Sequence, residues 1–508
     1  MDNFDSYALF LLVVIPMAGA VVVMLIPGAL KQQIRWVSSA FALSALLVSF
    51  YVFWAYDHEA GGFQFQRTWD WLAMPGTGPL SDKAITLALG IDGIAAPMIL
   101  LTGIVMFTGV LISWKIADRN KEFFVLYQLL LSGVFGVFVS LDLFFFFFFY
   151  ELAVLPMYLL IGVWGSSSEF PTFSRAKEYG AMKLMIFLVA GSVLIWIAIM
   201  AIFVESGIGS FNLLELQNVT FSDNFQRVFF PFLMVGFGVL AGLWPFHTWS
   251  PDGHVAAPTA VSMVHAGVLM KLGAFGIIRV GILLMPEGAQ DWMPVLIGLG
   301  TVNVLYGAWS ALGQTDLKYV IGYSSVSHMG YVLMGIATLN SLGVTGAVLQ
   351  MLSHGLMTAL FFAVVGVVYD KTHTRNINVL EGLSKRMGFT AALFAIAGFA
   401  SLGLPGLSGF VAELLVFLGL FQTYPILGVL GIIGAAITAV YILRLMAKVF
   451  FGPLGERWQD ETDASGLERF STLILAGFIL LVGLFPFPFI RVINTGVLEI
   501  LQKFPEAG

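Results

Sequence analysis

Residues 237–271, FGVLAGLWPFHTWSPDGHVAAPTAVSMVHAGVLMK, are the stretch around which the rest of the chain is organised. The stretch predicts two membrane-spanning segments joined by a short polar turn. Pro245 removes a backbone donor, so we expect the first helix to break at or before it. Within hydrocarbon, a broken helix persists only where its freed backbone groups face protein or a water-filled cavity. We therefore expect the freed backbone groups of this helix to face protein or such a cavity.

Two titratable side chains lie in the second segment. His265 and Lys271 are six residues apart, so along one helix they differ by about 9 Å in depth and lie on different faces. A lysine at membrane depth is costly and suggests a functional site. The simpler alternatives are a lysine that snorkels near a helix end and a histidine satisfied by a neighbouring carbonyl.

Composition places the whole chain in the membrane. Of its 508 residues, 59% are hydrophobic and only 11% are charged, whereas a soluble protein carries about a quarter charged residues. We therefore expect an all-α integral membrane protein. The chain has no cysteine, which excludes disulfides, thiolate metal ligands and iron–sulfur clusters on it. No basic segment precedes the first span, so we expect no cleavable signal peptide.

Apolar runs of about 20 residues predict fourteen spans in a single membrane domain. They are residues 7–27, 34–55, 85–112, 123–140, 143–164, 178–204, 228–249, 258–281, 291–311, 320–338, 345–369, 390–422, 425–447 and 470–494.

Charges between the spans orient the bundle. Odd-to-even connections carry basic residues, among them Lys31, Arg35, Lys115, Arg119, Lys121, Arg175, Lys177, Lys371, Arg375 and Lys448. The alternate connections carry mainly acids, among them Asp57, Glu59, Glu205, Glu215, Asp223, Glu287 and Asp291. We therefore expect the basic connections to be cytoplasmic. Both termini should lie on the outer, periplasmic or extracellular, face of the cell's inner (plasma) membrane.

A weak internal repeat relates two halves of the chain. The motif at residues 140–143 (SLDL) opens the fifth span, and residues 314–317 (QTDL) open the tenth. Pro245 interrupts the seventh span, and residues 404–409 (LPGLSG) interrupt the twelfth. Each pair is five spans apart, so the second unit must be inverted. This predicts inverted repeats at 123–281 (helices 4–8) and 291–447 (helices 9–13), a pattern that points to a transport site at the midplane.

Further titratable residues lie inside the spans: Glu151, Lys183, His328, His354, Glu413 and, in the first part of the third span, Asp92. A series of acids, lysines and histidines joined by water is what a proton relay requires. The alternative is that each group hydrogen-bonds two helices together, at about 0.6 kcal/mol on average. The sequence has no Gly-rich phosphate loop and no bis-histidine haem spacing. We interpret residues 247–254 (HTWSPDGH) as a capped turn rather than a metal site.

Several long motifs carry a family resemblance: residues 146–165 (FFFFYELAVLPMYLLIGVWG), 245–259 (PFHTWSPDGHVAAPT), 268–276 (VLMKLGAFG), 314–335 (QTDLKYVIGYSSVSHMGYVLMG) and 404–417 (LPGLSGFVAELLVF). Along nearly its whole length the chain resembles the antiporter-like subunits of respiratory complex I, most of all the M type. The resemblance implies fourteen helices, two inverted five-helix repeats and a hydrophilic axis for protons. By position it implies relay roles for Glu151, Lys183, Lys271, His328, His354 and Glu413.

The chain departs from that pattern in the seventh span. The family places a lysine there, paired with the glutamate of the fifth helix, and the matching position is Leu240. His265 resembles the L type rather than the M type. An unpaired buried carboxylate costs several kcal/mol. We therefore expect a contact between Glu151 and Lys183, direct or through one water, or else a protonated Glu151.

Three functions follow as expectations. The first is a proton-translocating membrane-arm subunit of an NADH:quinone oxidoreductase, with L-type and N-type neighbours. On this reading quinone, NADH, FMN and iron–sulfur clusters bind to other subunits, and this chain carries no cofactor, metal or nucleic acid. The second is a subunit of a related cation/proton antiporter or membrane-bound hydrogenase. The third is a scaffold that does not pump, which only Leu240 favours.

Overall fold

The computed structural model describes residues 2–74, 83–169 and 174–504, and most of them are helical. The first helices are α1 (Asp2–Leu25), α2 (Lys31–Ala55), α3 (Ala95–Ile112), α4 (Asn120–Val139), α5 (Leu143–Trp164), α6 (Lys177–Ser206), α7 (Leu213–Leu216), α8 (Asp223–Ala241), α9 (Trp249–Ala256), α10 (Thr259–Val264) and α11 (Met270–Gly276). They are followed by α12 (Pro286–Gly313), α13 (Leu317–Ala337), α14 (Ser341–Thr372), α15 (Gly388–Ser401), α16 (Ser408–Thr423), α17 (Pro425–Val449), α18 (Gly466–Leu484) and α19 (Phe487–Leu501).

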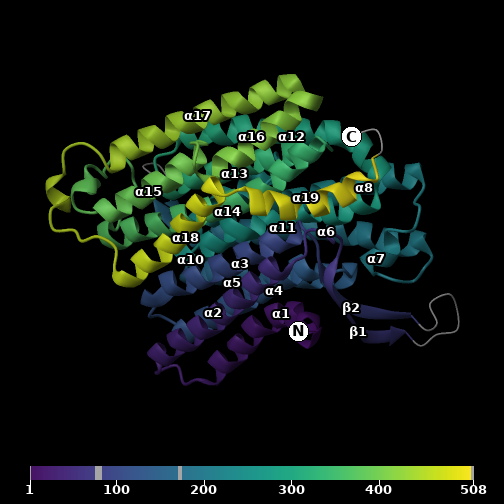
Figure 1. Ribbon diagram of the computed structural model, residues 1–508. Coiled ribbons are helices and arrows are strands. Elements are labelled where there is room, and N and C mark those ends of the chain that lie inside the picture. The colour runs from purple at the N-terminus through teal and green to yellow at the C-terminus, as the bar shows by residue number, and fades with distance from the viewer. Residues whose placement is uncertain (1, 75–82, 170–173, 505–508) are drawn as a thin grey trace.

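Two of the helical rods lie at the centre of the bundle. The rod that runs from α10 through the π-helical turns η3 (His265–Leu269) and η4 (Ile277–Ile282) is buried along its whole apolar window, and so is α14. These two rods pack against each other. In Figure 1, α17 lies along one edge of the bundle and α1 along the opposite edge. The helices that carry Lys271 and His354 are therefore the ones most shielded from lipid.

The predicted number of spans agrees with the helices that the structure describes. Thirteen helices in the described ranges are long and apolar enough to cross a membrane, judged by length and composition. Two shorter apolar helices, α15 and α16, together occupy the predicted twelfth span. The predicted fourteenth span, 470–494, is wrong in its limits, because the chain breaks after Leu484 and restarts as α19. Pro486 and Pro488 fall at that junction, where a proline ends one helix and can start the next.

The predicted start of the third span is also wrong. Residues 64–91 contain an antiparallel hairpin of β1 (Gln64–Met74) and β2 (Lys83–Ile91), and α3 begins only at Ala95. Asp92 fixes that start, because its carboxylate accepts hydrogen bonds from the backbone N–H groups of Ile94 and Ala95 at 3.1 and 2.9 Å. An apolar run cannot distinguish strand from helix by hydropathy alone. A second, very short pair comprises β3 (Ser168–Glu169) and β4 (Ser174–Arg175).

The break predicted in the seventh span is confirmed. Helix α8 ends at Ala241, Gly242 has a φ of 78°, and Pro245 precedes the 3₁₀ turn η2 (Phe246–Thr248). The polar stretch that follows is a buried helix, α9, so the predicted turn is wrong. Its polar side chains find partners inside the protein, which removes the need to reach water. The twelfth span is likewise broken between α15 and α16, where Gly403 and Gly406 have φ values of 70° and 94°.

Two helix starts in the proposed repeats have the same construction. Asp142 accepts hydrogen bonds from the N–H groups of the second and third residues of α5, and Asp316 does the same for α13. Each aspartate also forms an antiparallel bridge to an asparagine, Asn212 and Asn376 respectively. These matched contacts agree with the internal repeat, which stays a prediction.

Candidate functional site

Lys271 is fully buried on α11 and points into the bundle. Its Nζ donates a hydrogen bond to Nδ1 of His354 on α14 at 2.7 Å, and another to the carbonyl oxygen of Ala266. Ala266 lies in the π-helical turn η3, a local irregularity that is frequent at functional sites. The ammonium therefore stays at membrane depth, and the snorkelling alternative does not describe it.

A second cluster continues from His354 towards α16. The rings of His354 and His328 have centroids 5.4 Å apart. His328 Nδ1 lies 3.3 Å from Glu413 Oε1, and His328 Nε2 lies 2.9 Å from the hydroxyl of Ser401. The break before α16 makes room for the carboxylate, since a Cβ at Gly403 would lie 2.9 Å from Glu413 Oε2. The structure thus places His354 and His328 between Lys271 and Glu413.

Asp252 on α9 is the centre of another charged cluster. Its carboxylate accepts a hydrogen bond from Lys183 Nζ at 2.8 Å and one from the hydroxyl of Tyr319 at 2.9 Å, and it pairs with Arg175. The aspartate itself is buried, and only 20% of the Lys183 side chain is exposed. Lys183 therefore has a counter-ion, and that counter-ion comes from the stretch interpreted as a turn.

The predicted direct contact between Glu151 and Lys183 is wrong. Half-buried Glu151 on α5 interacts with the hydroxyl of Ser192 on α6. Ser192 is nine residues beyond Lys183, or about 13 Å along the same helix. Among the described residues Glu151 forms no ion pair. Lys183 pairs with Asp252 instead, so among the described residues the Glu151 carboxylate has no cationic partner.

Leu240 occupies the position where the family carries a lysine, and its surroundings are apolar. Leu240 is completely buried on α8. Phe237, one turn earlier, packs on Phe146 of α5 with ring centroids 5.8 Å apart. Leu240 lies three residues after Phe237 on the same helix. It places an apolar side chain at the position that matches the family's lysine.

His265 lies against a histidine that the sequence analysis did not select. The ring of His254 on α9 is 4.0 Å from that of His265, and Trp249 stacks on His265 at 5.1 Å. His254 Nε2 lies 3.0 Å from the hydroxyl of Ser250. Within the described part of the chain both ring nitrogens of His265 lack a hydrogen-bond partner. His265 is thus not held by a neighbouring carbonyl, contrary to the simpler alternative.

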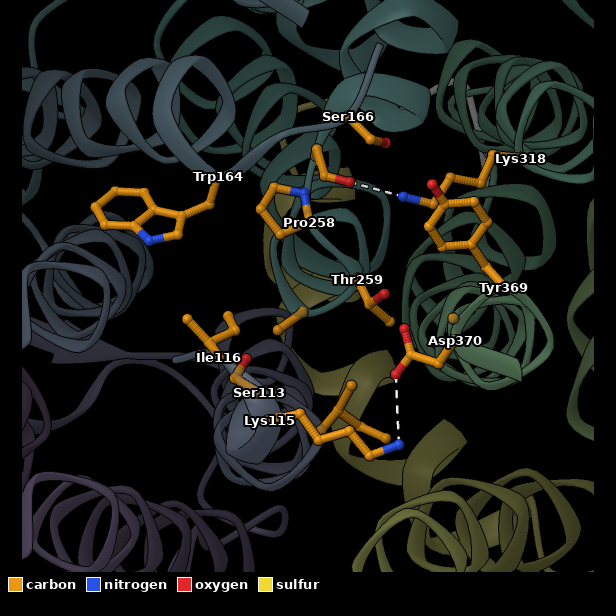
Figure 2. Close-up of a pocket in the computed structure, with 14 residues that line it drawn as sticks. Ser113, Lys115, Ile116, Trp164, Ser166, Pro258, Thr259, Lys318, Tyr369 and Asp370 are labelled. Atoms are coloured by element: carbon orange, nitrogen blue, oxygen red, sulfur yellow. Dashed lines mark hydrogen bonds and ion pairs between the residues drawn. The ribbon is translucent and has the colours of Figure 1, made fainter. Parts of the chain in front are cut away.

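A cavity of about 280 Å³ lies beside the start of α10, and neither histidine of this pair lines it. Figure 2 shows Lys115, Thr259, Lys318 and Asp370 around it. Exposed Lys115 lies 3.5 Å from Asp370 and 2.5 Å from Glu468. Buried Lys318 donates to the carbonyl oxygen of Ala257 at 2.6 Å and lies 3.4 Å from the hydroxyl of Ser262. That hydroxyl donates to the carbonyl oxygen of His254 at 2.8 Å.

Asp92 does not contact the titratable row formed by Lys271, His354, His328 and Glu413. It pairs with Arg279 in the turn η4, both side chains are almost fully buried, and Asp92 also caps α3. Those contacts give it a structural task at a helix start. In the described residues no group of three or more His, Asp or Glu side chains is arranged to hold a metal ion.

The sequence analysis missed the residues that link the predicted ones: Arg175, Asp252, His254, Lys318 and Tyr319. Asp252 and His254 lie in the polar stretch between two predicted spans, residues 247–254, which the sequence predicts to be a turn. The signal that could have found them is the density of polar side chains next to Pro245, because a broken helix needs polar partners in hydrocarbon.

The fold and the site together define a polytopic membrane protein with a row of titratable side chains buried at its centre. The family model described as NADH:quinone oxidoreductase/Mrp antiporter, TM matches residues 140–438. The chain belongs to this family, as a homologue of its chain 4 members, the antiporter-like subunits of complex I.

Two relatives illustrate this similarity. NAD(P)H-quinone oxidoreductase chain 4 2 of Thermosynechococcus vestitus is 38% identical over 488 residues, which are 94% of this chain and 89% of the relative. The chain 4 protein of Gloeobacter violaceus is 34% identical over 489 residues, with the same coverage of 94% and 89%.

Solved structures show the same architecture. A chain of respiratory complex I from Thermus thermophilus superposes with a TM-score of 0.87 at 27% identity, covering 97% of this chain and 99% of that one. A chain of the Mrp complex from Dietzia sp. superposes with a TM-score of 0.85 at 19% identity, covering 99% and 98%. The second likeness concerns the fold alone.

Proposed function

We propose that this chain is the M-type proton-translocating subunit in the membrane arm of an NADH:quinone oxidoreductase. The observation that carries the proposal is the buried row Lys271, His354, His328 and Glu413, in which each member contacts or neighbours the next. If these groups only held helices together, we would expect separate hydrogen-bonded pairs scattered between the helices. A row of groups that can each gain or lose a proton is what a relay needs.

Proton movement along the row follows from the hydrogen bonds. Lys271 as an ammonium can pass a proton to Nδ1 of His354, which leaves a neutral amine and an imidazolium. His354 Nε2 has no partner among the described residues, so a bridging water can take the proton on towards His328. His328 then lies within reach of the Glu413 carboxylate. Each transfer moves one positive charge by one residue, and the interior's low dielectric couples it to the next.

The cavity in Figure 2 supports an entry route from the face that carries the basic connections. We propose that protons pass from the surface near Asp370 to Lys318, then through water to the ring Nδ1 of His254, which has no partner among the described residues, and on to His265. The 4.0 Å histidine pair adjoins Lys271, with which both rings interact electrostatically. On this proposal, the histidine pair and the Asp252–Lys183 cluster take over, in the first half of the bundle, from the lysine that the family has where this chain has Leu240.

The rest of the assembly belongs to the same proposal. We place this chain in the inner (plasma) membrane beside L-type and N-type neighbours, with both termini outside. Quinone, NADH, FMN and the iron–sulfur clusters are assigned to other subunits. The relatives of 34 to 38% identity all bear the oxidoreductase name, which favours this function over a cation/proton antiporter or a hydrogenase subunit.

The test is proton pumping by the assembled complex in proteoliposomes. Lys271→Met and Glu413→Gln should each slow the step through the altered residue by about 100-fold. NADH oxidation should slow in parallel, and assembly should remain intact. Lys371→Met, which removes an exposed lysine hydrogen-bonded to Thr462, is the matched control and should pump normally. Normal pumping by both site variants would refute the relay and leave the scaffold function.

A further inference from the structure

A groove lies on the surface of the bundle, between the end of α1, the start of α4 and the end of α5. Its volume is about 440 Å³. We call it the α4–α5 groove, lined by Arg119, Lys121, Glu122, Val125, Leu126 and Leu159. Trp164 lines both this groove and the cavity of Figure 2, and no member of the titratable row lines the groove.

The polar end of the groove is positively charged. Arg119 and Lys121 face one carboxylate, Glu122, whose Oε1 lies 3.9 Å from Arg119 Nε. The Arg119 guanidinium lies 5.7 Å from the centre of the Trp164 ring, and its side chain is 55% exposed. A third cation, Lys177, donates from its Nζ to the carbonyl oxygen of Val163, another lining residue, at 2.7 Å. The groove itself is lined by two cations and one acid, with Lys177 beside it, and this balance favours an anionic occupant.

The rest of the groove is apolar and extends into the membrane layer. Leu126 is six residues beyond the start of α4, which places it about 9 Å deeper along the helix. Leu159 lies five residues before the end of α5, at a matching depth. Trp164, whose indole N–H donates to the carbonyl oxygen of Asp118 at 2.9 Å, marks the level of the membrane–water interface, where tryptophan is enriched. A free anion would use only the basic end.

We propose that the α4–α5 groove binds an anionic phospholipid. The phosphate lies at Arg119 and Lys121, and the upper part of an acyl chain lies along Val125, Leu126 and Leu159. Basic pockets between membrane helices recognise lipid headgroups in this way. The site takes no part in the proton row, so the two proposals can fail independently.

The test uses the full-length chain purified in detergent, with lipid retention measured by native mass spectrometry. The probes are phosphatidylglycerol and phosphatidylcholine with identical acyl chains. The chain should bind phosphatidylglycerol more tightly. In the double variant Arg119→Gln/Lys121→Gln, affinity should fall about 30-fold, from about tenfold per 1.4 kcal/mol and about 1 kcal/mol per cation. The control Arg444→Gln/Arg469→Gln removes two other arginines and should bind normally.

A second variant tests the apolar half. Leu159→Trp fills the groove from an exposed position without changing charge, so it should weaken retention of both lipids while the chain still folds. Equal affinity for the two lipids, or the same loss in the control, would overturn the proposal. So would normal lipid retention by Arg119→Gln/Lys121→Gln with weakened assembly, because a neighbouring protein would then occupy the groove.

Discussion

Position 240, a leucine in this chain, is the residue at which the first half of the bundle departs from the family resemblance. With leucine there, Lys183 pairs with Asp252 at 2.8 Å, and Glu151 is left to the hydroxyl of Ser192. Because Phe237 of α8 packs on Phe146 of α5, we expect a lysine at position 240 to reach Glu151. The two residues form a pair that substitution can rebuild.

We predict that Leu240→Lys is tolerated only while Glu151 is present. A buried lysine without a counter-ion destabilises by about 3–5 kcal/mol, whereas a paired one largely escapes that cost. Combining Leu240→Lys with Glu151→Gln should therefore cost about 3 kcal/mol more than the sum of the single changes. Thermal unfolding of the purified single and double variants would measure this coupling. Additive effects would mean that position 240 does not face Glu151.

At the scale of elements, the starts of α5 and α13 share a cap but differ in charge balance. Burial raises the pKa of Asp142 to about 6, despite hydrogen bonds from Phe145, Phe144 and Thr86 that lower it. Asp316 instead forms an ion pair with Arg375 at 3.1 Å. Ionisation therefore costs stability at the first cap, whereas the second cap carries an ion pair.

We predict opposite effects of Asp→Asn at these two caps. Because the pKa of Asp142 is higher in the folded than in the unfolded state, its stabilising contribution is present below about pH 4. That contribution is lost as the pH rises to about 6. Asp142→Asn keeps the cap, so it should stabilise by about 2 kcal/mol at pH 8 and by little at pH 4. Asp316→Asn should destabilise at pH 8, since it leaves Arg375 unpaired. Thermal unfolding at both pH values checks the pair, and equal shifts would contradict it.

At the scale of the whole molecule, both termini lie on the same face. Tyr7 near the N-terminus accepts a hydrogen bond from Arg67 of the hairpin at 3.3 Å. Lys503 near the C-terminus donates to the carbonyl oxygen of Gln217 at 3.1 Å. In Figure 1 the hairpin β1–β2 and α7 project from the same end of the bundle. Lys31 holds the connection after α3 at the opposite end, through the carbonyl oxygen of Ala117.

The absence of cysteine makes the orientation directly measurable. Asp57→Cys should react with a membrane-impermeant maleimide in intact cells or spheroplasts. Asp118→Cys should react only after the membrane is opened, because the positive-inside rule places its connection in the cytoplasm. Both positions are exposed, so burial cannot explain a difference. The reverse pattern would invert the bundle and move the cavity of Figure 2 to the outer face.

The sequence by itself determined the membrane class, the number of spans and both helix breaks. These follow from local properties, namely run length, the missing donor of Pro245 and the glycines of residues 404–409. The sequence also selected Lys271, His354, His328 and Glu413 as relay candidates, and their relay role stays a prediction. The family comparisons agree with the family resemblance along nearly the whole chain.

Only the tertiary structure decided which charges meet. The pairing of Lys183 with Asp252, and of Asp92 with Arg279, joins residues 69 and 187 positions apart. Hydropathy carries no information on which side of a helix faces which neighbour. The predicted direct contact of Lys183 with Glu151, on the neighbouring helix in sequence, was therefore wrong. The sequence also predicted α9 to be a turn, because polar residues between two spans suggest water. Partners of Asp252 from α6, β4 and α13 satisfy it instead, and packing alone supplies such partners.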